Sequence, residues 1–206
     1  MTILPSQTCQ NPLLYLASAS PRRKDLLERM GLTLSIHPQD VDETFLSSHP
    51  KREARRLARL KAAALSEALE KGEDAWILGA DTFLIFRGRL LGKPADREDA
   101  RKMLQVLSGR RHRVITGLAL QIPRKGMKAW TVTTPVEFHR FSPGDIEWYL
   151  DTGEWKDAAG AYKIQGAGAC LVRKIIGSYP NVMGLPIDSL YGILRRYDFP
   201  FEGEKP

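Results

Sequence analysis

A short run of serines and arginines near the N-terminus has the composition of a phosphate-binding site. The segment LASASPRR contains Ser18 and Ser20, then Pro21, and then the consecutive cations Arg22 and Arg23. Ser20 suits the N-cap of a helix and Pro21 its first position, so the arginines fall in the first helical turn. Because a helix N-terminus already carries partial positive charge, cations there indicate a bound anion. Ser18 and the two guanidinium groups suit a phosphate; an ordinary capped helix with solvated arginines is the alternative.

A carboxylate and a lysine further along the chain are candidates for the same site. GADT places Asp81 in an apolar, strand-like segment that Gly79 interrupts. A buried carboxylate is costly without a metal or a cation beside it, so Asp81 is a candidate site residue, with turn capping as the alternative. In LLGKP, the rigid loop 92–94 would fix the charge of Lys93 near whatever Asp81 faces, unless Lys93 is simply solvated.

A glycine-rich segment, AAGAYKIQGAGA, spans residues 158–169 and contains one amide side chain, Gln165. An amide donates and accepts hydrogen bonds at the same time, which suits the edge of a nucleobase. The glycine spacing matches neither the dinucleotide fingerprint nor the P-loop. Two interpretations of this segment therefore remain: Gln165 recognises a nucleobase, or the segment is a flexible surface loop. For base recognition, Gly160, Gly166 and Gly168 would let the backbone approach the base closely.

Acidic residues and a basic helix add further candidates. Asp40, Asp42 and Glu43 in DVDETF form either a solvated turn or a carboxylate source for a divalent cation. The segment KREARRLARLKAAALSEAL repeats apolar residues at helical spacing, so most of its cations lie on a solvated face. Lys61 borders that apolar stripe, so its side chain faces either the solvent, like the other cations, or the interior of the protein. The stripe consists of Ala54, Leu57, Leu60, Ala64 and Leu65.

The composition restricts the class of protein. With 206 residues, 43% of them hydrophobic and 27% charged, the chain is typical of a soluble globular protein. Its 31 Lys and Arg against 24 Asp and Glu give a net charge of +7, which suits nucleotides, nucleic acid or a well-solvated surface. Cys9 and Cys170 lie far apart without metal-ligand spacing, which argues against a disulfide framework or a zinc site and favours a reducing cytoplasm. We expect no signal peptide, because no basic segment precedes LLYLASAS and a core-like helix follows it at once. We expect no membrane-spanning helix, because no apolar run approaches about 20 residues.

The apolar periodicity predicts an α/β chain with a mixed sheet, organised as one domain over residues 1–206. Strand-like runs alternate with helical patterns at first, and two later runs flank a turn near Lys125 and Gly126 as an antiparallel hairpin. Asp96 and Ser142 are suited to cap two of the helices. The expected strands lie near 13–18, 32–37, 75–86, 111–123 and 128–141, and the expected helices near 20–31, 50–71, 97–109, 145–153 and 188–197.

In this order, the motifs resemble those of the Maf family of nucleoside triphosphate pyrophosphatases, also described as septum-formation inhibitors. The matching segments extend from about Leu13 to Pro186 and include LASASPRR, GADT, LSGRRHRVITG, YLDTGEW, AGAYKIQGAGA and GSYPNVMGLP. The resemblance implies a mixed α/β fold related to the inosine triphosphatases, with flanking helices and two lobes around a central cleft. It also implies hydrolysis of a nucleotide between its α and β phosphates, which yields the monophosphate and pyrophosphate.

The resemblance carries specific roles onto residues of this chain. Asp81 matches the family's proposed catalytic carboxylate, which would orient or deprotonate the attacking water. A divalent cation, Mg²⁺ or Mn²⁺, is implied, with Glu43 and Asp81 as its ligands. AYKIQG is similar to the branch that acts on dTTP and UTP, where the specificity positions match Arg22, Thr82 and Gln165. The phosphate-binding positions are Ser18, Arg22, Arg23, Lys61 and Lys93.

Two other classes of function remain as alternatives. A nucleic-acid-binding regulator of septum formation would suit the basic charge, but the aromatic residues are not interleaved with the cations. A nucleotide-binding module without turnover would not require Asp81. The expected partner is a nucleoside triphosphate, with no membrane and no specific nucleic acid, and the oligomeric state, a homodimer included, stays open. The family's description connects such an enzyme with cell-division arrest or with sanitation of the nucleotide pool.

Overall fold

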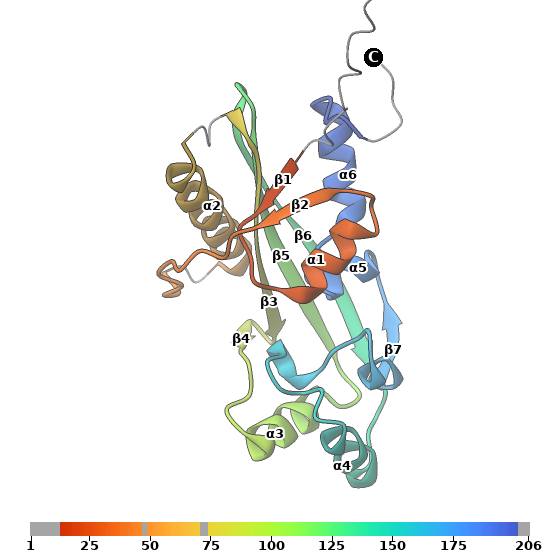
Figure 1. Cartoon of the computed structure of the whole chain (residues 1–206). Coiled ribbons are helices and arrows are strands. Elements are labelled where there is room, and N and C mark those ends of the chain that lie inside the picture. The colour runs from red at the N-terminus through yellow and green to blue at the C-terminus, as the bar shows by residue number, and fades with distance from the viewer. Residues whose placement is uncertain (1–12, 47–48, 71–73, 202–206) are drawn as a thin grey trace, which may run out of the picture.

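A mixed β-sheet forms the centre of the computed structural model, which describes residues 13–46, 49–70 and 74–201 (Figure 1). Its strands are β1 (Leu13–Leu16), β2 (Thr33–Ile36), β3 (Trp76–Phe86), β4 (Arg89–Leu91), β5 (Arg111–Ile122), β6 (Gly126–Phe138) and β7 (Val172–Ile175). The strand order is β2-β1-β3-β5-β6-β7, and β4 pairs with β3. Strand β1 pairs in parallel with β2 and β3, and the remaining pairs are antiparallel.

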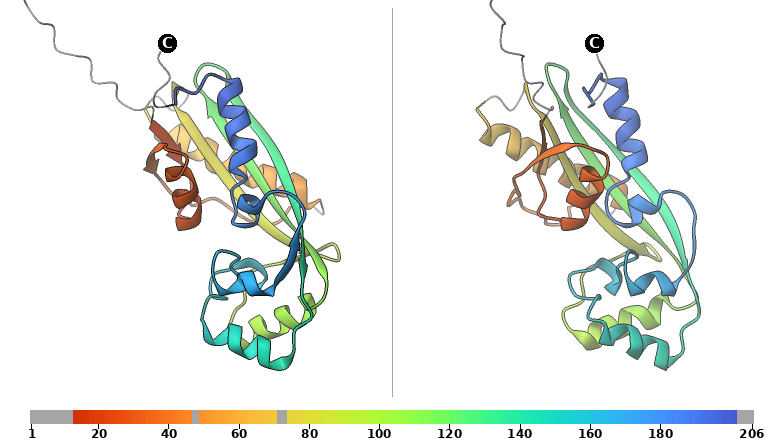
Figure 2. Two further views of the ribbon diagram at one scale, coloured as in Figure 1. Left: turned by 90° about the vertical axis from the view of Figure 1, so that its right-hand side faces the viewer. Right: turned by 45° about the vertical axis from the view of Figure 1, so that its right-hand side comes forward.

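Different helices cover the two faces of this sheet (Figures 1 and 2). The α-helices are α1 (Pro21–Glu28), α2 (Pro50–Ala68), α3 (Arg97–Leu107), α4 (Pro143–Asp151), α5 (Tyr179–Val182) and α6 (Ile187–Arg196). Helix α2 crosses one face over β3 and β5, while α1, α5 and α6 lie on the opposite face. Neighbouring side chains of β3 point to opposite faces, so Ile77 belongs to the apolar cluster of α2 and Leu78 to the main core.

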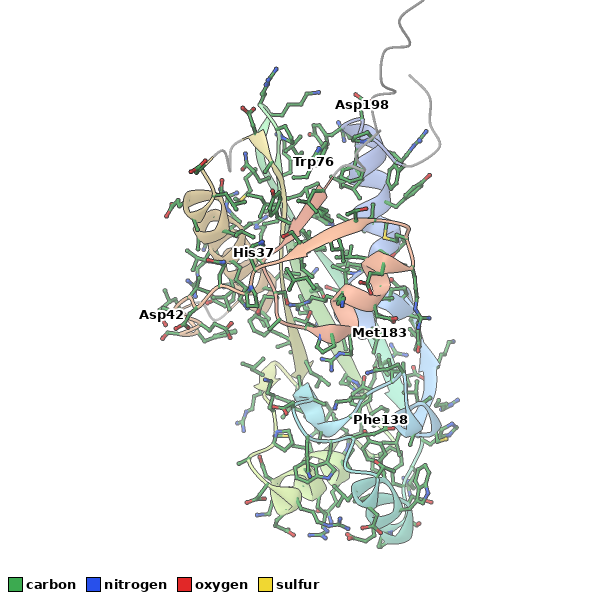
Figure 3. The ribbon with its side chains drawn as sticks, in the orientation of Figure 1. His37, Asp42, Trp76, Phe138, Met183 and Asp198 are labelled. Atoms are coloured by element: carbon green, nitrogen blue, oxygen red, sulfur yellow. The ribbon has the colours of Figure 1, made fainter. Side chains whose placement is uncertain are left out.

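A mainly helical part lies beyond the far ends of β3, β5 and β6 (Figure 2). We call it the helical lobe; it consists of α3, α4 and the short 3₁₀ helices η2 (Ala159–Ala161) and η3 (Ala167–Leu171). Asp96 caps α3 by accepting a hydrogen bond from the backbone N–H of Asp99, and Ser142 and Asp145 form the capping box of α4. Phe138, labelled in Figure 3, is buried in the core of this lobe.

The structure confirms the mixed α/β class, the β5–β6 hairpin and the helix caps predicted at Asp96 and Ser142. The expectation that Gly79 interrupts a strand is wrong, because β3 runs unbroken through it. The apolar stripe of α2 is also shifted, since Leu60 is 38% exposed whereas Ala58 and Ala62 are fully buried. The helix expected to reach residue 71 ends earlier, and residue 71 lies outside the described residues.

Several short elements have no counterpart in the sequence pattern, namely β4, β7, α5, η2 and η3. Each spans five residues or fewer, which is too short to show a hydrophobic period, and is set by pairing or packing with its neighbours. The described ranges contain no helix that is both long and apolar enough to cross a membrane.

Candidate active site

A cavity of about 680 Å³ lies between the sheet and the helical lobe. Its lining comes from the start of α1, the segment before α2, the middle of α2 and β3, the loop after β4, and the loop between η2 and η3. Asp40 and Asp42 do not line this cavity, whereas nine of the candidate residues from the sequence do: Ser18, Arg22, Arg23, Glu43, Lys61, Asp81, Thr82, Lys93 and Gln165. The fold therefore gathers into one site residues that are spread over most of the chain.

Two carboxylates meet one ammonium group at the wall of the cavity. The Nζ atom of Lys61 lies 2.6 Å from Oδ1 of Asp81 and 2.6 Å from Oε1 of Glu43. The Lys61 and Asp81 side chains are each 11% exposed, whereas the Glu43 side chain is 60% exposed. Asp81 therefore has the cationic partner that its buried position requires, and Lys61 faces inward.

Two glycines allow this contact by letting helix α2 lie directly on the sheet. A Cβ atom on Gly79 would stand 2.2 Å from the carbonyl oxygen of Ala58, and one on Gly117 would stand 2.1 Å from that of Ala54. Gly117 is the antiparallel partner of Asp81 in β5. The close approach of α2 to β3 at these points sets how far the Lys61 side chain reaches toward Asp81.

Arg23 is buried and forms hydrogen bonds within the protein. Its Nη1 atom donates to Oγ of Ser18 at 2.8 Å, its Nη2 atom to Oγ1 of Thr82 at 3.1 Å, and its Nε atom to the carbonyl of Gly184 at 3.0 Å. Burial lowers the pKa of Arg23, and the nearby charge of Asp81 opposes this shift. A guanidinium group has five N–H donors and these contacts use three, so two have no partner among the described residues, and Arg23 lines the cavity.

Arg22 keeps more of its donors available than Arg23. Its Nε atom donates to the carbonyl of Met183 at 3.3 Å, and within the described residues its terminal nitrogens have no hydrogen-bond partner. Burial lowers its pKa. Ser20 occupies the N-cap position of α1 but makes no side-chain cap, so the first turn of this helix has no side-chain acceptor at that position. Residues 18–23 at the start of α1 line the cavity, so the backbone N–H groups of its first turn are available to a ligand there.

The carbonyls of Met183 and Gly184 are site components that the sequence did not indicate. They accept hydrogen bonds from Arg22 and Arg23 and so hold both side chains in place. Every residue has a backbone carbonyl, so the residue types do not reveal which carbonyls accept these hydrogen bonds. The only signal available was that these residues belong to GSYPNVMGLP, one of the segments that resemble the Maf family.

Lys93 approaches the cavity from the loop after β4. Its Nζ atom lies 3.8 Å from Oδ1 of Asp157, and both side chains are largely exposed. An exposed pair at this distance holds its partners weakly, so Lys93 is able to turn toward an anionic ligand.

Gln165 presents an exposed side chain to the cavity, and no hydrogen bond to it occurs within the described part of the protein. The expected role of the neighbouring glycines needs correction, because each of them adjoins protein atoms. A Cβ atom would lie 2.4 Å from a methyl group of Leu84 at Gly160, 2.2 Å from the carboxylate of Glu154 at Gly166, and 2.4 Å from the carbonyl of Lys163 at Gly168. These glycines shape the loop itself.

Among the acidic residues of DVDETF, only Glu43 lines the cavity. Asp42 accepts a hydrogen bond from the backbone N–H of Thr44 at 2.8 Å, and hydrogen bonding to Thr44 lowers the pKa of Asp42. Asp42 is therefore a turn residue. The described ranges contain no group of three or more His, Cys, Asp or Glu side chains placed to hold a metal ion. At this site the protein therefore offers two carboxylates as possible metal ligands, those of Glu43 and Asp81. Cys170 is free and exposed, and Cys9 lies outside the described residues.

Comparison with known proteins identifies the family. The chain matches the family described as Maf-like protein over residues 13–197. It is 43% identical over 199 residues to the dTTP/UTP pyrophosphatase of Anaeromyxobacter dehalogenans strain 2CP-C, covering 95% of this chain and 99% of that protein. It is 45% identical over 187 residues to the dTTP/UTP pyrophosphatase of Halalkalibacterium halodurans, covering 90% and 96%.

Among solved structures, the Staphylococcus aureus Ham1 protein matches with a TM-score of 0.48 at 15% identity, over 89% of this chain and 98% of that one. A HAM1 protein from Coxiella burnetii gives the same TM-score at 18% identity, over 90% and 99%. From the family match and the identity to its relatives, this chain belongs to the Maf family.

Proposed function

We propose that this chain hydrolyses nucleoside triphosphates at the α–β phosphoanhydride, with dTTP and UTP as its preferred substrates, and releases the monophosphate and pyrophosphate. The observation that supports this most strongly is that one cavity contains a buried carboxylate, Asp81, together with Ser18 and the cations of the motifs. The relatives named dTTP/UTP pyrophosphatase support the same reaction.

The cations account for binding of the triphosphate. Arg22 offers its terminal guanidinium nitrogens, Arg23 its two remaining N–H groups, and Lys93 an exposed ammonium group. Phosphoryl transfer places negative charge on several phosphate oxygens at once, and donors fixed before the reaction stabilise that charge most effectively. The Ser18 hydroxyl and the α1 N-terminus add neutral donors to the same binding surface.

Asp81 is the residue that we assign to the attacking water. A carboxylate at the wall of the cavity accepts a proton from, or orients, a water molecule directed at the α phosphorus. Lys61 holds this carboxylate at a fixed position through the 2.6 Å contact. Positioning of the water by a fixed group reduces the entropy that the reaction must lose.

A divalent cation fits the same set of residues. Mg²⁺ in nucleotide enzymes is commonly held by one or two carboxylates together with substrate phosphates. Oε1 of Glu43 and Oδ1 of Asp81 contact the Lys61 ammonium, so the ion would be held by the second oxygen of each carboxylate, beside that ammonium. We therefore assign Mg²⁺ or Mn²⁺ to these two carboxylates. When bound, the ion would neutralise negative charge on the phosphate oxygens.

Base selection is assigned to Gln165, supported by Arg22 and Thr82. Uracil and thymine present an acceptor at O4 and a donor at N3, which one amide can match, whereas cytosine reverses this pattern. Gln165 has no protein partner in the described structure, so its amide is available to a base. The Thr82 hydroxyl is bonded to Arg23, Thr116 and Gly184, so it acts by fixing the arginine.

We further propose one bilobed domain over residues 1–206 and a location in the cytoplasm, where nucleotide substrates are found. The main apolar core includes residues of both the sheet and the helical lobe, which supports a single unit. A homodimer and a role in cell-division arrest or pool sanitation remain compatible with this assignment. A regulator without turnover would have no need for a buried carboxylate facing the phosphate-binding cations.

A panel of nucleotides tests the assignment. Purified protein with Mg²⁺ or Mn²⁺ should show the highest kcat/KM for dTTP and UTP, lower values for CTP, ATP and GTP, and pyrophosphate as the product throughout. Tight binding of UTP without turnover would support the non-catalytic alternative and contradict this proposal.

A further inference from the structure

The loop that carries Gln165 is attached to the protein by a carboxylate outside the cavity. Oε1 of Glu154 accepts a hydrogen bond from the backbone N–H of Ala167 at 2.9 Å, and Oε2 accepts one from Gly168 at 3.2 Å. Both amides lie at the start of η3, two and three residues after Gln165. Glu154 is not among the residues that line the cavity.

The loop is built to admit this carboxylate. A Cβ atom on Gly166 would stand 2.2 Å from Oε1 of Glu154, so a side chain there would displace the carboxylate. On the other side, the backbone N–H of Glu154 donates to Oγ1 of Thr152 at 3.1 Å, which orders the turn from which Glu154 extends. Glu154 therefore occupies a fitted position between the end of α4 and the loop.

A second contact holds the opposite side of the same loop. The backbone N–H of Lys163 donates to the hydroxyl of Tyr149 at 3.1 Å. Tyr149 belongs to α4 and is fully buried, and burial raises its pKa to about 12, so the hydroxyl stays neutral at ordinary pH. The contacts of Tyr149 and Glu154 lie on either side of Gln165 in the chain.

We infer that Glu154, assisted by Tyr149, is a positioning residue for base selection: it holds the loop so that the Gln165 amide keeps one orientation toward the base. This inference rests on the proposed role of Gln165. An amide that is free to flip offers a donor or an acceptor at the same place, and then UTP and CTP are matched equally well. Selectivity therefore requires a rigid support behind the amide, and the carboxylate clamp on Ala167 and Gly168 provides it.

Glu154→Gln is the sharpest variant, because it keeps the size of the side chain. Its amide oxygen still accepts one hydrogen bond, but its NH₂ group is a donor and opposes the second backbone N–H. Tyr149→Phe is the second variant, which removes only the hydroxyl that Lys163 contacts. Asp151→Asn is the matched control, because this carboxylate lies three residues earlier and contacts Arg97 of α3 at 2.6 Å.

Two measurements are made on each protein: hydrogen exchange of the peptide that contains residues 163–171, and kcat/KM for UTP and CTP with Mg²⁺. In Glu154→Gln we expect faster exchange of this peptide and a fall in the UTP to CTP ratio by about fivefold or more, within the range of a lost base contact. We expect kcat for UTP to change much less. Tyr149→Phe should shift both readouts in the same direction, and Asp151→Asn should leave both at the wild-type values.

Faster exchange with an unchanged UTP to CTP ratio in both variants would overturn the inference, since the clamp would then be structural only. Unchanged exchange in Glu154→Gln would overturn it as well. If Glu154→Gln fails to fold, Tyr149→Phe decides the question by the same two readouts. A wild-type protein that does not distinguish UTP from CTP would instead contradict the proposed role of Gln165, and the exchange data would still report whether the clamp exists.

Discussion

The ammonium group of Lys61 lies 2.6 Å from a carboxylate oxygen of Asp81, and this contact joins helix α2 to the central strand β3. Both side chains are largely buried, yet both line the cavity. The pair therefore belongs to the packing of the fold and to the site at once, so the fold itself sets the position of the carboxylate.

Asp81→Asn should retain the fold and nucleotide binding while turnover falls by about 10²- to 10⁴-fold, the usual contribution of a general base. The amide keeps the shape of the side chain and an acceptor for Lys61 but no longer takes a proton. Steady-state kinetics and calorimetric titration with UTP are the measurements. The control is Asp42→Asn, because Asp42 bonds to Thr44 outside the cavity. Wild-type turnover in Asp81→Asn would remove this residue from the mechanism.

Gly79→Ala should reduce both stability and turnover. The new methyl group would meet the carbonyl of Ala58 at 2.2 Å, so α2 must move away from β3 and carry Lys61 with it. We expect a loss of about 1–3 kcal/mol in the free energy of unfolding, measured in urea, together with a lower kcat. Gly192→Ala is the control, since among the described residues a methyl group on Gly192 in α6 would meet no atom within 4 Å beyond its chain neighbours and the backbone of its own helix. Equal stability in the two variants would show that α2 tolerates displacement.

Removal of divalent cations should abolish activity, because the charge of the triphosphate must be neutralised during the reaction. Addition of Mg²⁺ or Mn²⁺ after EDTA should restore it. In Glu43→Gln, restoration should require a higher concentration of metal, since one of the two carboxylates that converge on Lys61 is lost. Full activity of the wild-type protein in chelator would show that its own cations suffice.

Gln165→Ala should reduce the preference for UTP over CTP by about 1–3 kcal/mol, the usual value of a bidentate base contact. The side chain is exposed and has no partner in the described structure, so its removal should leave the melting temperature unchanged. The ratio of kcat/KM for the two nucleotides is the measurement. A lower melting temperature with an unchanged ratio would mean that Gln165 only supports the loop.

The stability of the protein should decrease between pH 6.5 and about 4 because of His112. Burial lowers its pKa from 6.5 to about 4 in the folded protein, while its Nε2 atom stays 2.9 Å from the hydroxyl of Tyr162. Over this interval the unfolded chain binds a proton that the native state does not, so stability is full above pH 6.5 and is lost as the pH falls, by up to about 3 kcal/mol.

His112→Gln removes this titration and keeps a polar partner for Tyr162, so its free energy of unfolding should depend less on pH across the same interval. Urea unfolding at pH 7 and at pH 4.5 provides the comparison. The control is His139→Gln, because it makes the same substitution at an exposed position. An unchanged slope in His112→Gln would assign the acid sensitivity to other groups.

Most of the candidate site could be predicted because its residues lie in short motifs with distinctive side chains. Arg22, Asp81 and Gln165 are charged or amide groups in places where packing alone does not require them, and that contrast is visible in a sequence. The structure adds that nine of the candidates line one cavity, while Asp40 and Asp42 lie outside it. The alternation of strands and helices likewise predicted the mixed sheet and the β5–β6 hairpin, because long elements carry a clear period.

The parts that escaped prediction depend on contacts between distant segments. Gly79 was interpreted as a break in a strand, whereas it permits α2 to approach β3, and no local pattern distinguishes these roles. The carbonyls of Met183 and Gly184 contribute through the backbone, which has no residue signature. In the sequence, nothing distinguishes Glu154 from an ordinary surface carboxylate; its contacts with the loop are visible only in the structure.

The first products formed from UTP test the central assignment most directly. In a rapid-quench experiment with Mg²⁺, the wild-type protein should form UMP and pyrophosphate in equal amounts from the earliest time point, with no UDP, and Asp81→Asn should form neither at a comparable rate. UDP and orthophosphate as the early products would place the cleavage at the β–γ bond and contradict the proposed function.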